Sequence, residues 1–556
     1  MAMSDQTGAA GLAGLDPESR KLVLDTVRQL RKKLLTKENI LEWDKKEIFP
    51  EEAIRKMLDP EIGLQLLFIP EAYGGIGGGA RDSCAVTREI SKICLGVATA
   101  FFAIQLGADP LLVAGTEEQK EKWLGAIADG KTLVAYAVTE PDAGSNLAAL
   151  QTTADPVHND SGTLIGYKVN GNKQFISTGG YADFITLLAR APEGPTFFVV
   201  EKGAKGFHQG KGEEKHGIRA SNTSALSFSD VFVPVENLIG GVAGRGLKQA
   251  NAVFGYTRLM VAAMGLGAGE AALNIAVPYA RERVQFGSPL CEKQGYTHKL
   301  IVPNAVRMEA ADAYIEEIAS RFDAGETDLE VEGSIAKLFA TEAGNKAAED
   351  AIQALGGYGY IAEYEVEKIK RDVRITCIYE GTSEIQQNII STFRWKASRK
   401  TKGGFYGGLQ AEMEALDARL PDLGCRYYAL AAGTLNAAVD LVHDNRLTRK
   451  QHVMFSLADM MMHVEVGACL ARKAARLADS GDGKAERTKT ASRIFANTVS
   501  EIVYQNILKI VKGSGVFNPE AAAEFLNRTS HADLADSYDN LITDMDRFSD
   551  FIFPRR

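Results

Sequence analysis

The sequence predicts an α+β fold that is mainly α-helical, with an N-terminal helical domain, a central antiparallel β domain, a C-terminal helical bundle and an appended helical domain. Apolar residues follow the helical period along most of the chain, whereas residues 133–244 consist of short β-type runs. The length of 556 residues exceeds what one hydrophobic core usually supports, so several packed domains are expected.

Residues 1–132 are predicted to form the N-terminal helical domain. The stretch "ESRKLVLDTVRQLRKKLL" (18–35) repeats apolar residues three and four positions apart, as an amphipathic helix does. The stretch "TEEQKEKWLGAIADG" (116–130) begins with a threonine and ends at a glycine, which are typical helix boundaries.

Residues 133–244 are predicted to form the β domain. Its runs are "LVAYAV" (133–138), "YKVNGNKQFIS" (167–177), "DFITLLAR" (183–190), "TFFVVEK" (196–202) and "TSALSFSDVFV" (223–233). Asn170 and Gly171 both tolerate a positive φ, so a hairpin turn is expected there.

Two helical segments follow. Residues 245–395 are predicted to form the helical bundle, and residues 409–556 the appended domain, separated by a basic, glycine-rich joint, "WKASRKTKGGFYGG" (395–408). In the appended domain, "EIVYQNILKIVKGSGVF" (501–517) is amphipathic. We expect it to be buried on its own domain, and peripheral membrane contact stays open as the alternative.

Composition narrows the function classes. The net charge of −9 argues against a nucleic-acid binder, whose domains are usually basic. The six cysteines are scattered, which is typical of free thiols, and the eight histidines show no metal-ligand spacing. No secretory signal and no uninterrupted apolar run of ~18 residues is found, so no transmembrane segment and a cytoplasmic location are expected.

Two strand ends carry groups suited to a polar ligand. In "AYAVTEPDAGSN" (135–146), Thr139, Gly144 and Ser145 offer hydroxyls and open backbone N–H groups, and a plain β-turn is the alternative. In "KQFISTGG" (173–180), Phe175 is available for stacking and Ser177 for hydrogen bonding, and an amphipathic strand is the alternative.

Two helix ends also stand out, of which the first suits a diphosphate and adenine. "ARERVQFG" (280–287) places Arg281 and Arg283 near Phe286, and a solvated helix terminus is the alternative. "IQALGGYGY" (352–360) ends a predicted helix with glycines that also suit a simple C-cap.

The stretch "CIYEGTSEIQQN" (377–388) holds one carboxylate between an apolar run and a helix-like pattern. Glu380 is either a solvated turn residue or a base directed into a pocket. The residues alone leave both interpretations open.

Together these motifs carry a family resemblance. The chain resembles the acyl-CoA dehydrogenases, because "AYAVTEPDAGS", "KQFISTGG", "ARERVQFG", "QALGGYGY" and "IYEGTSEIQ" occur in that family's order and approximate spacing, over residues 20–395. The extension after residue 400 is similar in placement to that of the very-long-chain members, which are dimers. A homodimer is therefore expected.

The resemblance implies FAD-dependent α,β-dehydrogenation of an acyl-CoA thioester. Glu380 matches the base that removes the α proton, while flavin N5 takes the β hydride and a trans-2-enoyl-CoA is left. The backbone N–H of Glu380 would hold the thioester carbonyl together with the ribityl 2′-hydroxyl. Electrons would pass to an electron-transfer flavoprotein.

Other roles follow from the resemblance in the same way. Phe175 stands where the family usually has tryptophan, and Ser177 where it has threonine. The expected FAD contacts are Tyr136, Val138, Thr139, Gly144, Ser145, Phe175, Ser177, Arg283, Phe286, Gln294, Gln353, Gly357, Thr382 and Glu384, of which Arg283, Phe286, Gln294, Gln353 and Gly357 would reach the FAD of a neighbouring subunit. The expected substrate contacts are Ser145, Thr257, Arg258, Tyr379 and Gly381.

The chain departs from the family pattern at two places. Gly255 stands where an acidic residue is common, and "IQQNIISTF" (385–393) lacks the usual arginines, which leaves the CoA nucleotide contacts open. An acyl-CoA oxidase, a decarboxylating acyl-CoA dehydrogenase and a non-catalytic acyl-CoA-binding or assembly protein stay as alternatives.

Overall fold

A computed structural model describes residues 12–554. The chain forms two compact units: unit 1 contains residues 12–268, 318–330 and 368–376, and unit 2 contains residues 269–317, 331–367 and 377–554. The predicted class, a mainly helical α+β fold with a central sheet, is confirmed.

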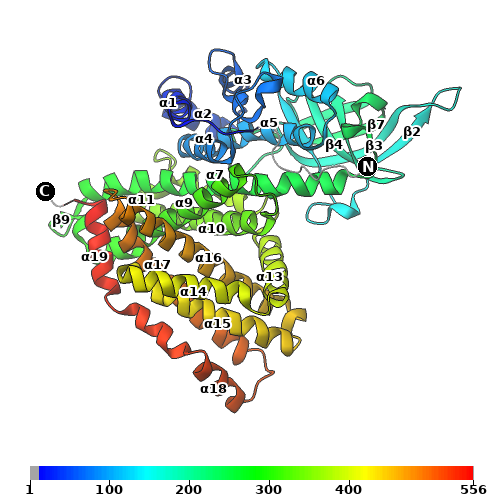
Figure 1. Cartoon of the computed structure of the whole chain (residues 1–556). Coiled ribbons are helices and arrows are strands. Elements are labelled where there is room, and N and C mark those ends of the chain that lie inside the picture. Colours follow the sequence, from blue (N-terminus) through cyan, green and yellow to red (C-terminus); the bar gives the residue numbers. More distant parts are fainter. Residues whose placement is uncertain (1–11, 555–556) are drawn as a thin grey trace. The chain divides into compact units, whose positions relative to one another are not determined.

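Unit 1 begins with a group of helices (Figure 1). Asp16 caps the first helix by accepting from the backbone N–H groups of Glu18 and Ser19, and Thr116 and Gln119 form a reciprocal capping box on the sixth. The helices are α1 (Pro17–Lys33), α2 (Lys37–Lys46), α3 (Glu51–Leu58), α4 (Ala80–Ile93), α5 (Leu95–Ala114) and α6 (Glu117–Ala128), with short 3-10 helices at Leu64–Phe68 and Glu71–Tyr73.

A sheet follows the helices in unit 1, ordered β1-β4-β2-β3-β7-β6 with β5 paired to β4. Most pairs are antiparallel as predicted, but β4 pairs in parallel with β1 and, at one point, with β2. The strands are β1 (Val134–Ala137), β2 (Thr153–His158), β3 (Leu164–Ser177), β4 (Phe184–Ala191), β5 (Gly194–Glu201), β6 (Phe207–Gly212) and β7 (Thr223–Pro234).

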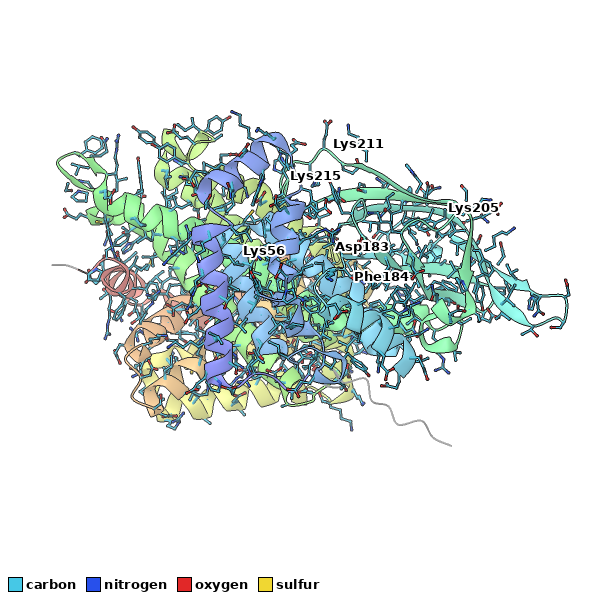
Figure 2. The ribbon with its side chains drawn as sticks, turned by 90° about the horizontal axis from the view of Figure 1, so that it is seen from above. Lys56, Asp183, Phe184, Lys205, Lys211 and Lys215 are labelled. Atoms are coloured by element: carbon cyan, nitrogen blue, oxygen red, sulfur yellow. The ribbon has the colours of Figure 1, made fainter. Side chains whose placement is uncertain are left out.

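The start of β4 joins the sheet to the helices. The Asp183 carboxylate accepts from the backbone N–H of Leu133, 2.9 Å away, and pairs with Arg55 of α3. Next to it, the Phe184 ring packs on the Trp123 ring of α6, with centroids 4.8 Å apart. Figure 2 shows Asp183 and Phe184 at the end of the sheet that lies next to these helices. Lys205 lies just before β6, and Lys211 lies near its end.

The hairpin predicted at Asn170-Gly171 is wrong, because both residues lie inside the continuous strand β3. The register against β7 shifts between Val169 and Gly171, which is a β-bulge. A Cβ on Gly171 would come within 2.6 Å of the Thr152 hydroxyl. Close approach of a neighbouring segment therefore requires this glycine, and no chain reversal occurs there.

Helices follow the sheet along the chain. They are α7 (Gly246–Glu282), α9 (Val302–Asp323), α10 (Glu330–Leu355), α11 (Gly357–Tyr360), α12 (Val366–Val373) and α13 (Ser383–Lys400). α11, α13 and nearly all of α10 belong to unit 2, α7 and α9 are divided between the two units, and α12 belongs mostly to unit 1. Between α7 and α9 lie the hairpin β8 (Val284–Gln285) and β9 (Ser288–Pro289), the short α8 (Gln294–Tyr296) and a π-helical turn, Thr297–Ile301.

Most of the appended helices of unit 2 lie side by side as a bundle, and α18 lies at its margin (Figure 1). They are α14 (Gly404–Arg419), α15 (Cys425–Asp444), α16 (Gln451–Asp479), α17 (Ala485–Val511), α18 (Pro519–Arg528) and α19 (Leu541–Ile552). Within the amphipathic stretch 501–517, Val503, Ile507 and Ile510 are buried, so its apolar face packs inside the unit as expected.

The predicted joint, residues 395–408, is mostly helical. α13 continues to Lys400, and α14 starts at Gly404 after a turn in which Gly403 has a φ of 82°. Arg399 and Lys400 lie in the last turn of α13, where basic side chains stabilise the helix dipole. The basic residues and glycines of this stretch therefore mark the end of one helix and the start of the next.

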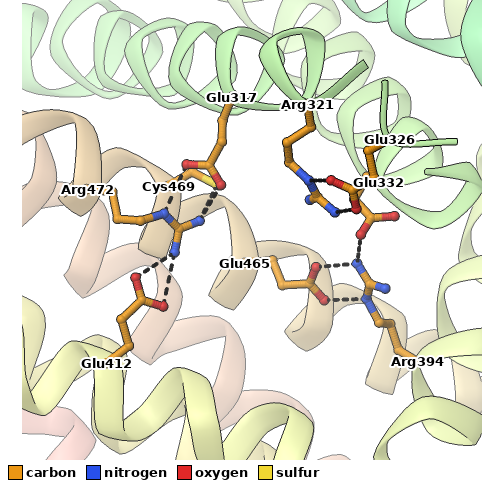
Figure 3. A network of polar contacts seen from close by, with 9 residues as sticks. All are labelled: Glu317, Arg321, Glu326, Glu332, Arg394, Glu412, Glu465, Cys469 and Arg472. Carbon is orange, nitrogen blue, oxygen red and sulfur yellow. Dashed lines mark hydrogen bonds and ion pairs between the residues drawn. The ribbon is translucent and has the colours of Figure 1, made fainter. Parts of the chain in front are cut away.

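Two arginines, the buried Arg394 and the partly buried Arg472, connect the appended helices to the rest of unit 2 (Figure 3). Arg394 of α13 forms a paired contact with Glu465 of α16, at 2.9 and 2.8 Å, and also reaches Glu332. Arg472 of α16 bridges Glu317 and Glu412.

By length and composition alone, α5, α7 and α16 are apolar enough to cross a membrane, which the prediction of no spanning segment overlooked. The most apolar windows of these helices are 78%, 78% and 83% buried inside the protein. Burial in the fold accounts for their composition, and scattered polar residues interrupt the apolar runs.

Candidate active site

The flavin-side residues predicted from sequence lie in unit 1, at the end of β1 and along β3. Tyr136 is buried in β1, with its ring stacked 5.7 Å from that of Phe197. Val138 is buried and Thr139 is half-buried, and the Thr139 carbonyl accepts from the backbone N–H of Gln174 on β3. Gly144 and Ser145 follow in an exposed loop.

A buried ion pair fixes this strand end. The Lys173 Nζ donates to the Val138 carbonyl at 2.9 Å and to the Glu140 carboxylate at 2.7 Å, and the Lys173 side chain has no exposed surface. The Glu140 carboxylate also accepts from the backbone N–H groups of Gln151 and Thr152. The loop that carries Thr139 is therefore held against β3 from inside.

Burial acts on both members of this pair. Burial lowers the pKa of Lys173 to about 8, although the contact with Glu140 opposes the shift. For Glu140, burial raises the pKa, but hydrogen bonds from Gln151, Lys173 and Thr152 outweigh it and hold the pKa below its ordinary value.

Phe175 and Ser177 lie on β3 next to a break in its register with β7, between Lys173 and Ile176. Phe175 has a φ of 60° and is 63% exposed, which is unusual for a large aromatic side chain on a strand. An exposed ring held in this way is available for stacking against a planar ligand.

Thr257 and Arg258 lie on α7 and are both buried. The Arg258 guanidinium lies 3.4 Å from the carboxylate of Glu330. Arg258 therefore has an ion-pair partner within unit 1, in addition to the substrate contact expected from sequence.

In unit 2, Glu380 lies in a tight turn just before α13. Glu380 has a φ of 56° and Gly381 a φ of 88°, so two consecutive residues are left-handed. Thr382 caps α13 by accepting from the backbone N–H of Ile385, and Glu384 is exposed in the first helical turn. Tyr379, Glu380 and Gly381 are half-buried, which leaves the carboxylate within reach of a ligand.

A second group of predicted residues surrounds a cavity of about 470 Å³ in unit 2. Arg283, Gln353 and Gly357 line it together, and the Arg283 guanidinium lies 5.6 Å from the Tyr358 ring centre. The other lining residues are Tyr279, Gln285, Leu290, Tyr296, Ala354, Leu355, Gly356, Tyr358 and Ile361.

Two predicted FAD contacts do not line this cavity. Phe286 is 96% exposed at the tip of the β8–β9 hairpin, with a φ of 49°. The Gln294 amide donates to Asp546 of α19 at 2.9 Å, a contact with the appended helices that the sequence did not predict.

The cavity residues fit the adenosine diphosphate end of FAD. Arg283 supplies a cation, Gln353 an amide, the glycines open backbone groups, and Tyr279 and Tyr358 aromatic faces. In unit 1, the exposed Phe175 ring suits a planar isoalloxazine. By contrast, residues 12–554 contain no group of three or more His, Cys, Asp or Glu side chains arranged to hold a metal.

Comparisons with known proteins show the family of the chain. The acyl-CoA dehydrogenase N-terminal, middle and C-terminal domain models match residues 17–131, 135–231, and 244–393 with 407–533. The chain is 41% identical over 380 residues to an acyl-CoA dehydrogenase of Bacillus subtilis, covering 67% of this chain and 96% of the relative.

Two further matches extend the comparison. A subunit of the caffeyl-CoA reductase–Etf complex of Acetobacterium woodii is 36% identical, covering 67% of this chain and 97% of the relative. The crystal structure of an acyl-CoA dehydrogenase complexed with FAD, from Bacillus anthracis, covers 97% of this chain and 96% of its own, with a TM-score of 0.80 at 24% identity. That fold therefore includes the appended helices.

The fold and these matches define a flavin-dependent oxidoreductase. More narrowly, the chain belongs to the acyl-CoA dehydrogenase family, and it is FAD-dependent.

Sequence reasoning missed several residues that support the site. Lys173 and Glu140 hold the flavin-side strand end, and Lys337 of α10 donates from a fully buried position to the Gly381 carbonyl. A lysine at an inward position of a strand or helix was the available signal. It is weak without a known register, because most lysines are exposed.

Proposed function

We propose that the protein dehydrogenates an acyl-CoA thioester to a trans-2-enoyl-CoA, with Glu380 as the base that removes the α proton. The observation that carries the proposal is the left-handed turn at Glu380 and Gly381, which presents one carboxylate directly before α13. A carboxylate there becomes a stronger base when a bound thioester excludes water from it.

The same turn supplies the second requirement of the reaction. As the α proton leaves, negative charge develops on the thioester oxygen, and a donor aimed at that oxygen lowers the barrier. In this proposal the backbone N–H of Glu380 is that donor, Tyr379 forms the wall of the acyl site, and Gly381 lets the chain pass close to the substrate.

Bound FAD supplies the acceptor for the β hydride. Phe175 and Ser177 orient the ring, and Tyr136, Val138, Thr139, Gly144 and Ser145 hold its polar edge and pyrophosphate, with Thr382 and Glu384 near the diphosphate. Arg283, Phe286, Gln294, Gln353 and Gly357 bind the nucleotide end of a neighbouring subunit's FAD. The proposal therefore includes a homodimer.

The electron acceptor, the CoA contacts, the metabolic role and the location of the enzyme are part of the same proposal. Electrons pass to an electron-transfer flavoprotein, which the match to a subunit of a reductase–Etf complex supports. Ser145, Thr257 and Arg258 contact the CoA side of the substrate. The enzyme acts in fatty-acid β-oxidation in the cytoplasm, and peripheral membrane contact is left to experiment.

The test is anaerobic titration of the flavin absorbance with saturated acyl-CoAs of graded length and type, on wild type and on Glu380→Gln. We expect one substrate class to bleach the flavin of the wild type. In Glu380→Gln the rate should fall on the order of 10³-fold, because the amide accepts no proton. Glu414→Gln, an exposed carboxylate on α14, is the matched control.

A wild type whose flavin no saturated acyl-CoA bleaches contradicts the proposal. Rapid reoxidation by oxygen in place of a flavoprotein acceptor favours an oxidase, and CO₂ release favours the decarboxylating alternative. A chain that binds acyl-CoA but cannot be loaded with FAD favours a non-catalytic binding protein.

A further inference from the structure

Two buried side chains from different helices donate hydrogen bonds to the turn that carries Glu380. Lys337 of α10 donates its Nζ to the Gly381 carbonyl. Gln386 of α13 donates its Nε2 to the Glu380 carbonyl at 3.1 Å and to the Gly381 carbonyl at 3.0 Å. Neither Lys337 nor Gln386 has any exposed surface.

The turn requires such support. A left-handed glutamate is sterically unfavourable by roughly 1–2 kcal/mol, so an isolated segment would leave this conformation. Its two carbonyls accept from donors fixed on α10 and on the second turn of α13. Hydrogen bonds to a charged donor are stronger than neutral ones, so Lys337 adds a firm restraint.

The turn is also closely packed against the side chains that hold it. A Cβ added to Gly381 would lie 2.7 Å from Gln386 Nε2, so the amide lies directly against the turn. The Ser383 hydroxyl donates to Glu342 of α10 at 2.6 Å, which adds a second link between the same two helices.

We infer that Lys337 and Gln386 are positioning residues that hold Glu380 in the conformation needed for α-proton removal. The inference rests on the proposed function. The φ and ψ of Glu380 determine both where its side chain leaves the backbone and where its N–H points. Holding the adjoining carbonyls therefore fixes the base and the oxyanion donor together, as one rigid group.

The experiment measures proton removal without oxidation. A 3-thia-acyl-CoA has sulfur in place of the β carbon, so it retains an α proton but has no β hydride to lose. Exchange of that proton with D₂O, followed by mass spectrometry on the FAD-loaded protein, reports the base alone. Binding of the same analogue is measured in parallel by calorimetry.

We expect exchange to slow on the order of 10²-fold in Lys337→Met and in Gln386→Leu, because small misplacements of a catalytic group are costly. The analogue's Kd and the FAD content should stay close to those of the wild type. Lys337→Arg keeps a cationic donor and should recover part of the rate. Arg472→Met removes a charge from unit 2 without touching the turn, so it should exchange at the wild-type rate.

Outcomes separate the two proposals. Wild-type exchange rates in both Lys337→Met and Gln386→Leu overturn the positioning role while leaving Glu380 as base. A wild type that does not exchange the proton, although it binds the analogue, overturns the proposed function itself. If Lys337→Met does not fold, Gln386→Leu and Lys337→Arg decide the question.

Discussion

At the residue scale, left-handed backbone marks three of the predicted site residues other than glycine. Phe175, Phe286 and Glu380 have φ values of 60°, 49° and 56°, although none is Gly, Asn or Asp. Such residues are uncommon and concentrate where surrounding structure holds strain for function. Two of the three are also exposed aromatics, so their conformations present ring faces to a ligand or a partner.

Gly381→Ala tests how much the turn depends on its glycine. The new Cβ would meet Gln386 at 2.7 Å and the φ of 88° would be strained. We expect the free energy of unfolding to fall by roughly 1–2 kcal/mol and turnover to drop strongly. Thermal unfolding and steady-state kinetics measure both changes.

Gly408→Ala is the matched control for that substitution. Gly408 lies inside α14, and nothing would meet its Cβ within 4 Å. It should raise stability slightly, by up to about 1 kcal/mol, because alanine favours a helix over glycine. Equal stability of the Gly381 and Gly408 variants would contradict the argument about the turn.

At the scale of elements, α13 connects the proposed base to the appended helices. Its N-terminal end carries the Glu380 turn and Gln386, and its second half carries Arg394, which pairs with Glu465 of α16. The Gln387 amide also donates to Asp459 of α16 at 2.8 Å. The appended helices thus fix the helix that follows the Glu380 turn.

Arg394→Met should destabilise unit 2 by about 3–5 kcal/mol, because it leaves the buried Glu465 carboxylate without its cation. Urea unfolding followed by circular dichroism measures the loss. The double variant Arg394→Met with Glu465→Met should recover most of it. Arg419→Met breaks an exposed ion pair with Asp479 and should lower the free energy of unfolding by less than about 1 kcal/mol. Equal losses of stability in Arg394→Met and Arg419→Met would refute the prediction.

At the scale of the whole molecule, buried thiols and phenols should make the fold sensitive to alkali. Burial raises the pKa of Cys84, Cys469, Tyr406 and Tyr428. In the unfolded chain the thiols lose their protons above about pH 8.5 and the phenols above about pH 10, whereas the native chain keeps them. The native state then binds more protons, so the free energy of unfolding falls as pH rises through this range.

Thermal unfolding measured from pH 7 to 10.5 under reducing conditions tests this. Each such group contributes up to about 1.4 kcal/mol per pH unit. Cys469→Ala should flatten the decline by up to that amount. A melting temperature that is constant between pH 8.5 and 10 would show that these groups ionise equally in both states.

The order of helical and β segments was predictable, because hydrophobic period distinguishes the two. The pairing of strands was not predictable, because the hydrophobic period shows which face of a strand is buried and not which strand lies beside it. The parallel β1–β4 pair was therefore missed.

Arg283, Gln353 and Gly357 were found from motifs, and the structure brings them to one cavity. Lys173 and Gln386 lie within the quoted motifs and Lys337 lies outside them, but their roles depend on which groups they contact, and the motifs do not show those contacts. The boundaries 1–132, 133–244, 245–395 and 409–556 stay predictions.

The hydrogen bonds that hold the Glu380 turn also affect the order in which parts of the protein can fold during synthesis. The partner of Gly381 on α10 lies 44 residues upstream, and Gln386 lies 5 residues downstream. Glu465, which anchors the far half of α13, is 71 residues beyond Arg394. At roughly 5–20 residues per second, synthesis delivers that anchor several seconds later. The contacts of the Glu380 turn with α10 and with Gln386 can therefore form before α16 is available to anchor the second half of α13.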